Sequence, residues 1–180
     1  MFIDRLAGAQ SVFAPAFEAL YLSAFPIEER KPIPMLYQHQ ASGHSEIYII
    51  RNQDNVFMGL MVTLFNHETL ILEYLAIDPN YRGQNIGGWA ITWLQASFPN
   101  HQIVLEIEQT LIPSADWQIR QRRREFYERH QFYFCDQTIQ YFDTRLELMS
   151  NQPIIHYQQY IQPYQSVYGQ DIGQKIYYLD

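Results

Sequence analysis

The residues from Arg82 to Gly88 have the composition of a turn that binds an anion. Three glycines within this turn let the main chain bend sharply and come close to a ligand, and the arginine adds a positive charge at its start. The residues before it, 70–77, read as a buried strand. A helix that begins after such a turn presents unpaired N–H groups and the positive end of its dipole to an anion. The pattern predicts a phosphate-binding turn, with an ordinary strand-to-helix connection as the alternative.

Two common nucleotide-binding motifs do not fit this segment. A Walker A loop has the pattern Gly-x-x-x-x-Gly-Lys-Ser/Thr, whereas Gly83 and Gly87 are one residue too close and are followed by Gly88 and Trp89. A Rossmann fingerprint has the pattern Gly-x-Gly-x-x-Gly, and Asn85 stands where its second glycine would be. A different type of nucleotide loop is therefore expected.

The loop resembles that of a known enzyme family. Arg82-x-x-Asn85-x-Gly87 is similar to the Arg/Gln-x-x-Gly-x-Gly/Ala pyrophosphate loop of the GNAT superfamily of acyl-CoA-dependent N-acetyltransferases. Residues 123–132 resemble the late helix of that family, which ends in Phe-Tyr-Glu-x-x-Gly-Phe. Two motifs in the right order, about 40 residues apart, are more specific than either alone. The resemblance covers residues 45–149, with a weaker similarity at residues 25–30.

The chain departs from the family pattern at two positions. Asn85 stands where the loop usually has glycine, and asparagine tolerates a left-handed backbone better than most other residues. Gln131 stands where the late motif usually has glycine. We expect the first departure to preserve the loop and the second to affect the geometry that follows Tyr127.

The resemblance implies where coenzyme A would bind. The main chain of Leu75, Ala76 and Ile77 would pair with the pantetheine arm, and an N–H group there would polarise the thioester carbonyl. On a helix, Arg120 and Arg123 share one face with Tyr127, so they either contact phosphates of the coenzyme or belong to a solvated basic face paired with nearby glutamates. The implied pyrophosphate-binding residues are Arg82, Gly83, Gln84, Asn85, Ile86, Gly87 and Gly88.

Acyl transfer from a thioester to an amine requires an acid for the thiolate and a base for the ammonium. Tyr127 corresponds to the tyrosine of the Phe-Tyr-Glu motif and is the candidate acid, with a core aromatic residue as the alternative. Glu73 shares a strand face with apolar residues, which would raise its pKa toward that of a useful base. Glu106 and Glu108 project together from a neighbouring strand and are equally open as bases, and salt bridges are the structural alternative for all three.

The predicted reaction is direct transfer of an acetyl group from acetyl-CoA to a primary amine in a ternary complex, without a covalent enzyme intermediate. The acceptor would be a small-molecule or peptide amine. A catalytically silent acyl-CoA-binding regulatory module is the main alternative, and a phosphate-binding protein with unrelated chemistry is a weaker one. A screen of amines with acetyl-CoA would separate these possibilities.

Composition restricts the possible partners and ligands. The net charge of −7 over 180 residues argues against nucleic acid and favours a cationic acceptor. Six scattered histidines and the single Cys135 predict no metal site and no internal disulfide. We expect no signal peptide and no membrane span, and hence a cytoplasmic protein, with a homodimer as one possibility.

Periodicity predicts a chain of strands and helices, and the family resemblance implies an α/β fold with a mixed, mostly antiparallel sheet of six or seven strands and helices on both faces. A domain over residues 1–150 would carry a Tyr- and Gln-rich extension without clear period, residues 151–180, packed on the same domain. Residues 24–40 would form at most a short helix. Predicted strands are 2–3, 46–51, 56–65, 70–77, 101–108, 131–137 and 140–149; predicted helices are 11–23, capped by Ser11, 86–98, and one from Ser114 or Asp116 to His130.

Overall fold

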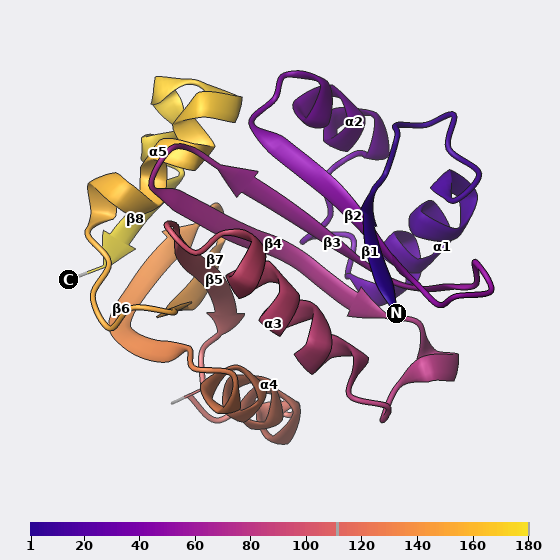
Figure 1. Cartoon of the computed structure of the whole chain (residues 1–180). Helices are drawn as coiled ribbons and strands as arrows, with labels where there is room; N and C mark the ends of the chain where they lie inside the picture. The colour runs from indigo at the N-terminus through magenta and orange to yellow at the C-terminus, as the bar shows by residue number, and fades with distance from the viewer. Residues whose placement is uncertain (111, 180) are drawn as a thin grey trace. The chain divides into compact units, whose positions relative to one another are not determined.

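The computed structural model describes residues 1–110 and 112–179 (Figure 1). Its α-helices are α1 (Ala14–Ala24), α2 (Ile33–Ala41), α3 (Ile86–Ser97), α4 (Trp117–Arg129) and α5 (Tyr157–Tyr168). Its strands are β1 (Phe2–Arg5), β2 (Ser45–Arg51), β3 (Phe57–Phe65), β4 (Thr69–Ile77), β5 (Gln102–Glu108), β6 (Tyr133–Tyr141), β7 (Thr144–Ser150) and β8 (Ile176–Leu179). Short 3₁₀ helices cover Pro79–Tyr81 and Gln170–Gln174.

The strands form one mixed, mostly antiparallel sheet in the order β1-β2-β3-β4-β5-β7-β6-β8. The parallel pair is β4 with β5, where Thr69 to Ile71 align with Gln102 to Val104. The predicted fold class is confirmed, but the sheet in the described residues has eight strands instead of six or seven. The additional strand is β8, which lies in the Tyr- and Gln-rich extension. It pairs antiparallel with β6. Asp180, the last residue of that extension, lies outside the described residues.

Prolines lie in the first turns of the first two helices. Helix α2 has nine residues, which agrees with the short helix expected, and Pro34 lies in its first turn, where a missing N–H costs nothing. Helix α1 begins at Ala14 with a proline in its first turn, three residues later than predicted. Ser11 does not cap it: its hydroxyl accepts a hydrogen bond from the N–H of Phe13, at 3.3 Å, in the turn before the helix.

The hairpin of β6 and β7 turns later than predicted. Tyr141 pairs with Thr144, so the turn consists of Phe142 and Asp143, and Phe142 has a positive φ of 51°. The register of the two strands shifts between Phe134 and Thr138, a segment in which Asp136 also has a φ of 51°. A bulge of this kind lengthens one strand locally, which a strict two-residue period cannot indicate.

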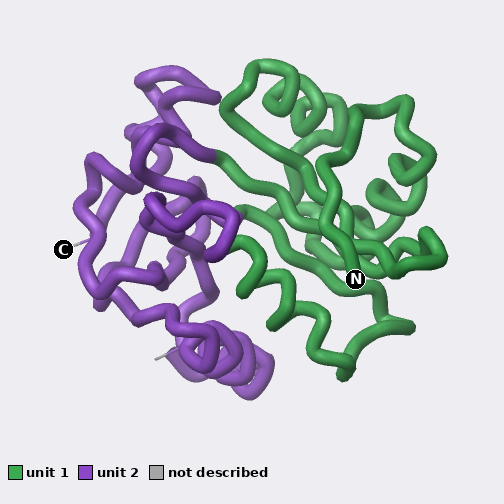
Figure 2. The backbone as a smooth tube through the Cα atoms, viewed as in Figure 1, with its two compact units in different colours: residues 1–64, 73–94 green, residues 65–72, 95–180 purple. Residues whose placement is uncertain are grey.

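Contacts divide the chain into two compact units, and the first contains residues 1–64 and 73–94 (Figure 2). In this unit, Ile47 and Ile49 of β2 belong to a core cluster with residues of α1 and α2. Tyr48, which points to the opposite face of the strand, packs edge-to-face on Trp93 of α3 at 5.3 Å between ring centroids. Helices therefore cover both faces of the sheet in this unit.

The second unit contains residues 65–72 and 95–180 (Figure 2). Its centre is the antiparallel set β5, β7 and β6, in which Val104 to Glu108 align with Ser150 to Leu146. Helix α5 contributes the buried aromatic rings of Tyr160 and Tyr164, whose centroids are 5.6 Å apart. The extension after residue 150 thus supplies both a strand and part of the core of this unit.

Candidate functional site

The Arg82–Gly88 loop lies in the first unit and is shaped by two left-handed residues. Gly83 has a φ of 77° and Asn85 a φ of 57°. The carbonyl of Asn85 accepts the N–H of Trp89 at 3.0 Å, so helix α3 begins directly after this residue. The expectation that asparagine preserves the loop where the family usually has glycine is consistent with this conformation.

The loop is open to a ligand and carries positive potential. Residues 82–85 are exposed, and the first N–H groups of α3, from Ile86 to Gly88, precede any intrahelical acceptor. The Nε of Arg82 donates to the carbonyl of Ile77 at 3.1 Å, which holds the arginine stem between the end of β4 and the loop. Main-chain donors, the helix dipole and one guanidinium are a combination suited to a diphosphate.

The end of β4 leads into this loop through a close contact between backbones. A Cβ on Gly59 of β3 would lie 2.6 Å from the carbonyl oxygen of Ala76, so only glycine allows this approach. The N–H of Asp78 donates to the carbonyl of Met58 at 2.9 Å, and the Asp78 side chain accepts the N–H of Asn80 at the same distance. The segment from Leu75 to Ile77, predicted to pair with pantetheine, is therefore fixed by its neighbours in the first unit.

Glu73, one of the three candidate bases, forms a buried ion pair with Lys31 in the first unit. The side chains of Lys31 and Glu73 are 12% and 4% exposed. The hydroxyl of Tyr21 accepts the N–H of Lys31 at 2.8 Å, and that of Tyr74 donates to the carbonyl of Glu29 at 2.7 Å, so two tyrosines order the segment that carries the lysine. The strand pattern indicated only apolar neighbours for Glu73, whereas the structure places an ammonium group beside it.

Tyr127, the candidate acid, lies in the second unit near two charged residues. Burial raises its pKa to about 12; Arg123 lowers that pKa and Glu108 raises it, both through charge. Arg123 and Glu108 form an ion pair with each other. The structure therefore brings together three predicted site residues, from β5 and α4, and keeps the tyrosine hydroxyl protonated at neutral pH.

The ring of Tyr127 also takes part in the end of helix α4. The N–H of Gln131 bonds to the carbonyl of Glu128 and that of Phe132 to the carbonyl of Tyr127, both at 3.1 Å, which is a Schellman motif. The Tyr127 and Phe132 rings pack with centroids 5.8 Å apart. Gln131 adopts the left-handed conformation, with a φ of 65°, so this turn forms even though the family's glycine is absent.

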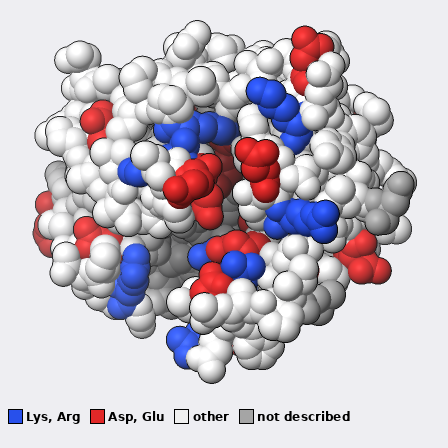
Figure 3. Space-filling model, turned by 180° about the vertical axis from the view of Figure 1, so that it is seen from behind, with Lys and Arg blue, Asp and Glu red and all other residues white. Residues whose placement is uncertain are grey.

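Two other arginines of α4, Arg120 and Arg124, have partners within the second unit. Arg120 pairs with Asp116 at 2.9 Å, and Arg124 pairs with Glu128 at 2.8 Å and lies over the ring of Phe134. Figure 3 likewise shows acidic and basic side chains side by side among the described residues of one face. The basic face proposed for phosphate binding is thus extensively neutralised by carboxylates, and the assignment of Arg120 and Arg123 to the coenzyme stays a prediction.

Glu106 has surroundings in the second unit that the sequence did not indicate. The hydroxyls of Tyr160 and Tyr164 both donate to its Oε1, at 2.9 and 2.5 Å. Burial, followed by the charge of Glu106, raises the pKa of Tyr160 well above its ordinary value, so this hydroxyl keeps its proton. A signal was present: Tyr157, Tyr160 and Tyr164 have helical spacing, so the statement that the extension lacks a period was wrong.

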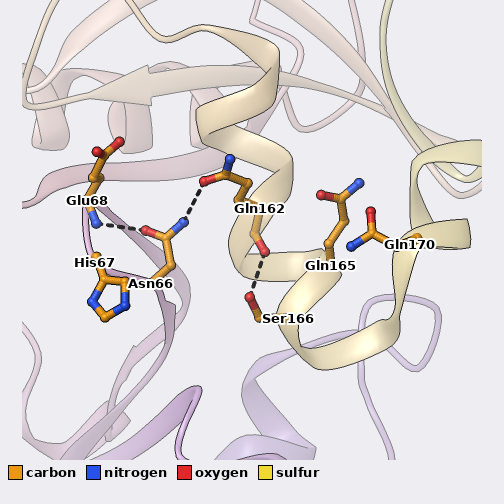
Figure 4. Close-up of a pocket in the computed structure, with 7 residues that line it drawn as sticks. All are labelled: Asn66, His67, Glu68, Gln162, Gln165, Ser166 and Gln170. Carbon is orange, nitrogen blue, oxygen red and sulfur yellow. Dashed lines mark hydrogen bonds between the residues drawn. The ribbon is translucent and has the colours of Figure 1, made fainter.

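A polar depression elsewhere in the second unit contains none of the predicted site residues (Figure 4). Its volume is about 370 Å³, and Asn66 donates to Gln162 across it at 3.2 Å. Four of its seven lining side chains are neutral amides. The lining residues are Asn66, His67, Glu68, Gln162, Gln165, Ser166 and Gln170.

The described residues contain neither a group suited to hold a metal ion nor a helix suited to span a membrane. Within residues 1–110 and 112–179, no three His, Cys, Asp or Glu side chains are grouped so that they could hold a metal ion. Over the same residues, no helix has the length and apolar character needed to cross a membrane. Cys135 is buried, which raises the pKa of its thiol to about 11.

The comparison with protein families finds a match over the part of the chain that contains both motifs. A family model described as an acetyltransferase (GNAT) domain matches residues 43–133, which include both the loop and Tyr127. A comparison with curated proteins finds no match.

Solved structures share the fold at low sequence identity. An acetyltransferase assigned to the GNAT family from Bacteroides thetaiotaomicron is 22% identical, with a TM-score of 0.78 over 94% of this chain and 99% of that chain. An aminoglycoside 6′-N-acetyltransferase in complex with coenzyme A is 15% identical, with a TM-score of 0.66 over 87% and 99%. A variant of the spermidine N-acetyltransferase from Vibrio cholerae is 14% identical, with a TM-score of 0.61 over 83% and 94%.

Proposed function

Because this chain belongs to the GNAT family of acetyltransferases, as its two motifs indicated, we propose that it transfers an acetyl group from acetyl-CoA to a primary amine. The observation that carries the proposal is the loop with left-handed Gly83 and Asn85 at the start of α3. Its N–H groups suit the pyrophosphate of the coenzyme, which would be a substrate of the reaction. Residues 82–88 and the main chain of residues 75–77 are the binding residues in this proposal.

The reaction balances with the residues at hand. The amine, once neutral, attacks the carbonyl carbon of the thioester, and an N–H at the end of β4 polarises the carbonyl oxygen. The carbon–sulfur bond then breaks, the attacking nitrogen loses its extra proton to water to give the amide, and the thiolate takes the proton of the Tyr127 hydroxyl. A pKa of about 12 supports this role, because such a hydroxyl is always protonated at neutral pH. Solvent later returns a proton to the tyrosine.

Each of the three candidate bases already interacts with a hydrogen-bond donor. Lys31 pairs with Glu73 and Arg123 with Glu108, while two tyrosine hydroxyls bond to Glu106. These partners already contact carboxylate oxygens that a base would need for the proton of an ammonium group. In this proposal the ammonium therefore loses its proton through water, and the carboxylates attract a cationic acceptor.

Two neighbours in fold support a cationic acceptor. One is named for aminoglycosides and one for spermidine, and both are amines. The net charge of −7 agrees, because a surplus of acid attracts cations over several ångströms.

A thiol-release assay with acetyl-CoA and a panel of amines tests the function. We expect release of coenzyme A that depends on the amine, with mono-, di- and polyamines and peptide N-termini compared at equal concentration. Ion pairing at both Glu73 and Glu108 favours the second candidate, a silent acyl-CoA-binding module. Saturable acetyl-CoA binding by calorimetry without thiol release for any amine would support that module and contradict the enzyme.

A further inference from the structure

No side chain of α4, the helix that carries Tyr127, is fully buried. Trp117 and Ile119, two of its large apolar residues, are 45% and 57% exposed. A surface helix is usually fixed by an apolar stripe that packs on the core. Polar contacts therefore contribute much of what fixes the place of α4 in the second unit.

Thr110, which follows β5 and is 1% exposed, accepts three hydrogen bonds from α4. Its carbonyl accepts the indole N–H of Trp117 at 3.0 Å and the side-chain amide N–H of Gln121 at 2.8 Å. Its hydroxyl accepts a hydrogen bond from Nη1 of Arg124 at 3.1 Å. The three donors are spaced i, i+4 and i+7, so they share one face of the helix, and Tyr127 follows Arg124 by three residues. Thr110 thus binds the turns of α4 that lead to Tyr127.

The hydroxyl of Thr110 is held in turn by a buried carboxylate. It donates to Oε2 of Glu147 on β7 at 2.7 Å, and Glu147 is 2% exposed. A guanidinium has only donors, so the Thr110 oxygen accepts from Arg124 and keeps its single proton for the carboxylate. Glu147 aligns with Ile107 of β5 and with Thr138 of β6, so it lies on the middle strand of this antiparallel set. The Arg124–Thr110–Glu147 chain of hydrogen bonds therefore connects α4 to that strand.

Proton transfer makes strict demands on the place of an acid. A hydroxyl that protonates a thiolate must come within hydrogen-bond distance of the sulfur, and a displacement of about 1 Å can cost roughly a hundredfold in rate. In the proposed reaction Tyr127 supplies this hydroxyl, and the place of its ring depends on the place of α4. Contacts that fix this helix just before Tyr127 can therefore affect the rate, although the residues that make them have no part in the chemistry.

We propose that Thr110 and Glu147 are positioning residues for Tyr127, the proposed acid, and that they act on it through Arg124 and helix α4. This inference rests on the proposed acetyl transfer and adds to it two residues outside both sequence motifs. All the contacts that it uses lie within the second unit. It gives a role to Glu147, a buried carboxylate that the reaction itself does not use.

The test removes the Thr110 hydroxyl and, separately, its acceptor. Thr110→Val keeps the shape of the side chain without the hydroxyl, Thr110→Ser retains the hydroxyl, and Glu147→Met removes the acceptor oxygens. The matched control is Thr69→Val. Thr69 lies in the same unit and is also 1% exposed, but its hydroxyl has no hydrogen-bond partner among the described residues.

Three measurements are made on each variant, alone and combined with Tyr127→Phe. Steady-state assays with acetyl-CoA and the most reactive amine of the panel give kcat and KM, and calorimetry gives the Kd for acetyl-CoA. Hydrogen exchange measures how readily residues 117–129 open. Glu147→Met provides the same comparison where Thr110→Val fails to fold.

We expect Thr110→Val and Glu147→Met to lower kcat roughly ten- to a hundredfold, with the Kd for acetyl-CoA changed less than about twofold. Both should speed hydrogen exchange in α4, whereas Thr110→Ser and Thr69→Val should stay near the wild type. When Tyr127→Phe is already present, Thr110→Val should lower kcat little further, because the hydroxyl that it misplaces is absent. A purely structural role would lower kcat by the same factor whether or not the Tyr127 hydroxyl is present.

An unchanged kcat in folded Thr110→Val, an equal loss in Thr69→Val, or a fall that does not depend on the Tyr127 hydroxyl would overturn the inference and leave the proposed function intact. A wild type that releases no thiol with any amine would instead refute the acetyltransferase. Hydrogen exchange would then decide whether Thr110 and Glu147 fix α4, and unchanged exchange in both variants would overturn the inference as well.

Discussion

The Arg82–Gly88 loop of the first unit and the Glu108–Arg123–Tyr127 cluster of the second are built in opposite ways. The loop depends on main-chain conformation, with left-handed Gly83 and Asn85 and the first N–H groups of α3. The cluster depends on side chains from two elements, an ion pair and a tyrosine hydroxyl. A main-chain site is formed by consecutive residues, whereas a side-chain cluster requires tertiary contacts. The two should therefore respond differently to substitution.

The largest expected effect is on the main-chain site. Gly87→Glu places a carboxylate in the first turn of α3, where it would repel a pyrophosphate and block its approach. We expect the Kd for acetyl-CoA to rise by more than about a hundredfold in a protein that still folds. Calorimetry measures this, and Ala96→Glu, an exposed position in the last turn of α3, is the control of equal charge. Unchanged affinity in the first variant would remove the coenzyme assignment.

Ion pairs offer a second comparison of the two units. Lys31→Met leaves Glu73, 4% exposed, without its ammonium partner, and we expect a loss of about 3–5 kcal/mol in the free energy of unfolding. Arg123→Met breaks a pair whose members are 44% and 22% exposed, and there we expect about 1 kcal/mol or less.

Urea denaturation followed by circular dichroism gives both values. Adding Glu73→Met to Lys31→Met removes the orphaned charge and should restore part of the lost stability. Similar losses in Lys31→Met and Arg123→Met would show that burial does not govern these pairs.

Tyr127→Phe tests whether the cluster acts in catalysis. The variant keeps the ring that packs on Phe132 and loses the hydroxyl, so kcat should fall roughly ten- to a thousandfold while the Kd for acetyl-CoA stays nearly constant. Because burial raises the pKa to about 12, the wild-type rate should show no loss from ionisation of this tyrosine up to its ordinary pKa of 10. The control is Tyr133→Phe, 51% exposed. Equal kcat in wild type and Tyr127→Phe would leave Tyr127 with packing alone.

The smallest effect is expected at the end of α4. Gln131 has a φ of 65°, a conformation that costs a non-glycine residue roughly 1–2 kcal/mol. Gln131→Gly should therefore raise the free energy of unfolding by about 1 kcal/mol, less the extra entropy of glycine in the unfolded chain. Thermal denaturation shows whether the variant is more or less stable than the wild type. A lower melting temperature in Gln131→Gly would mean that the glutamine side chain makes a compensating contact.

Most of the fold could be predicted where the pattern is local. Hydrophobic period and turn residues predicted the strands within residues 46–77 and 101–108 and the helix after the glycine loop. The observed bounds of these elements differ from the predicted ones by only a residue or two. The errors have local physical causes as well: a proline in the first turn of α1, and a bulge near Asp136. β8 was missed because four residues are too few to show a period and their stability comes from pairing with β6.

The sequence by itself determined the loop and the family, because both reside in a few consecutive residues, and it predicted Tyr127 as the acid through the resemblance to the family motif. Only the tertiary structure decided what surrounds the carboxylates. Lys31 is 42 residues from Glu73, and the tyrosines that hold Glu106 are more than 50 residues from it. Side chains so far apart meet through packing of whole elements, and charge and hydrogen bonding depend on that packing far more than on the local pattern.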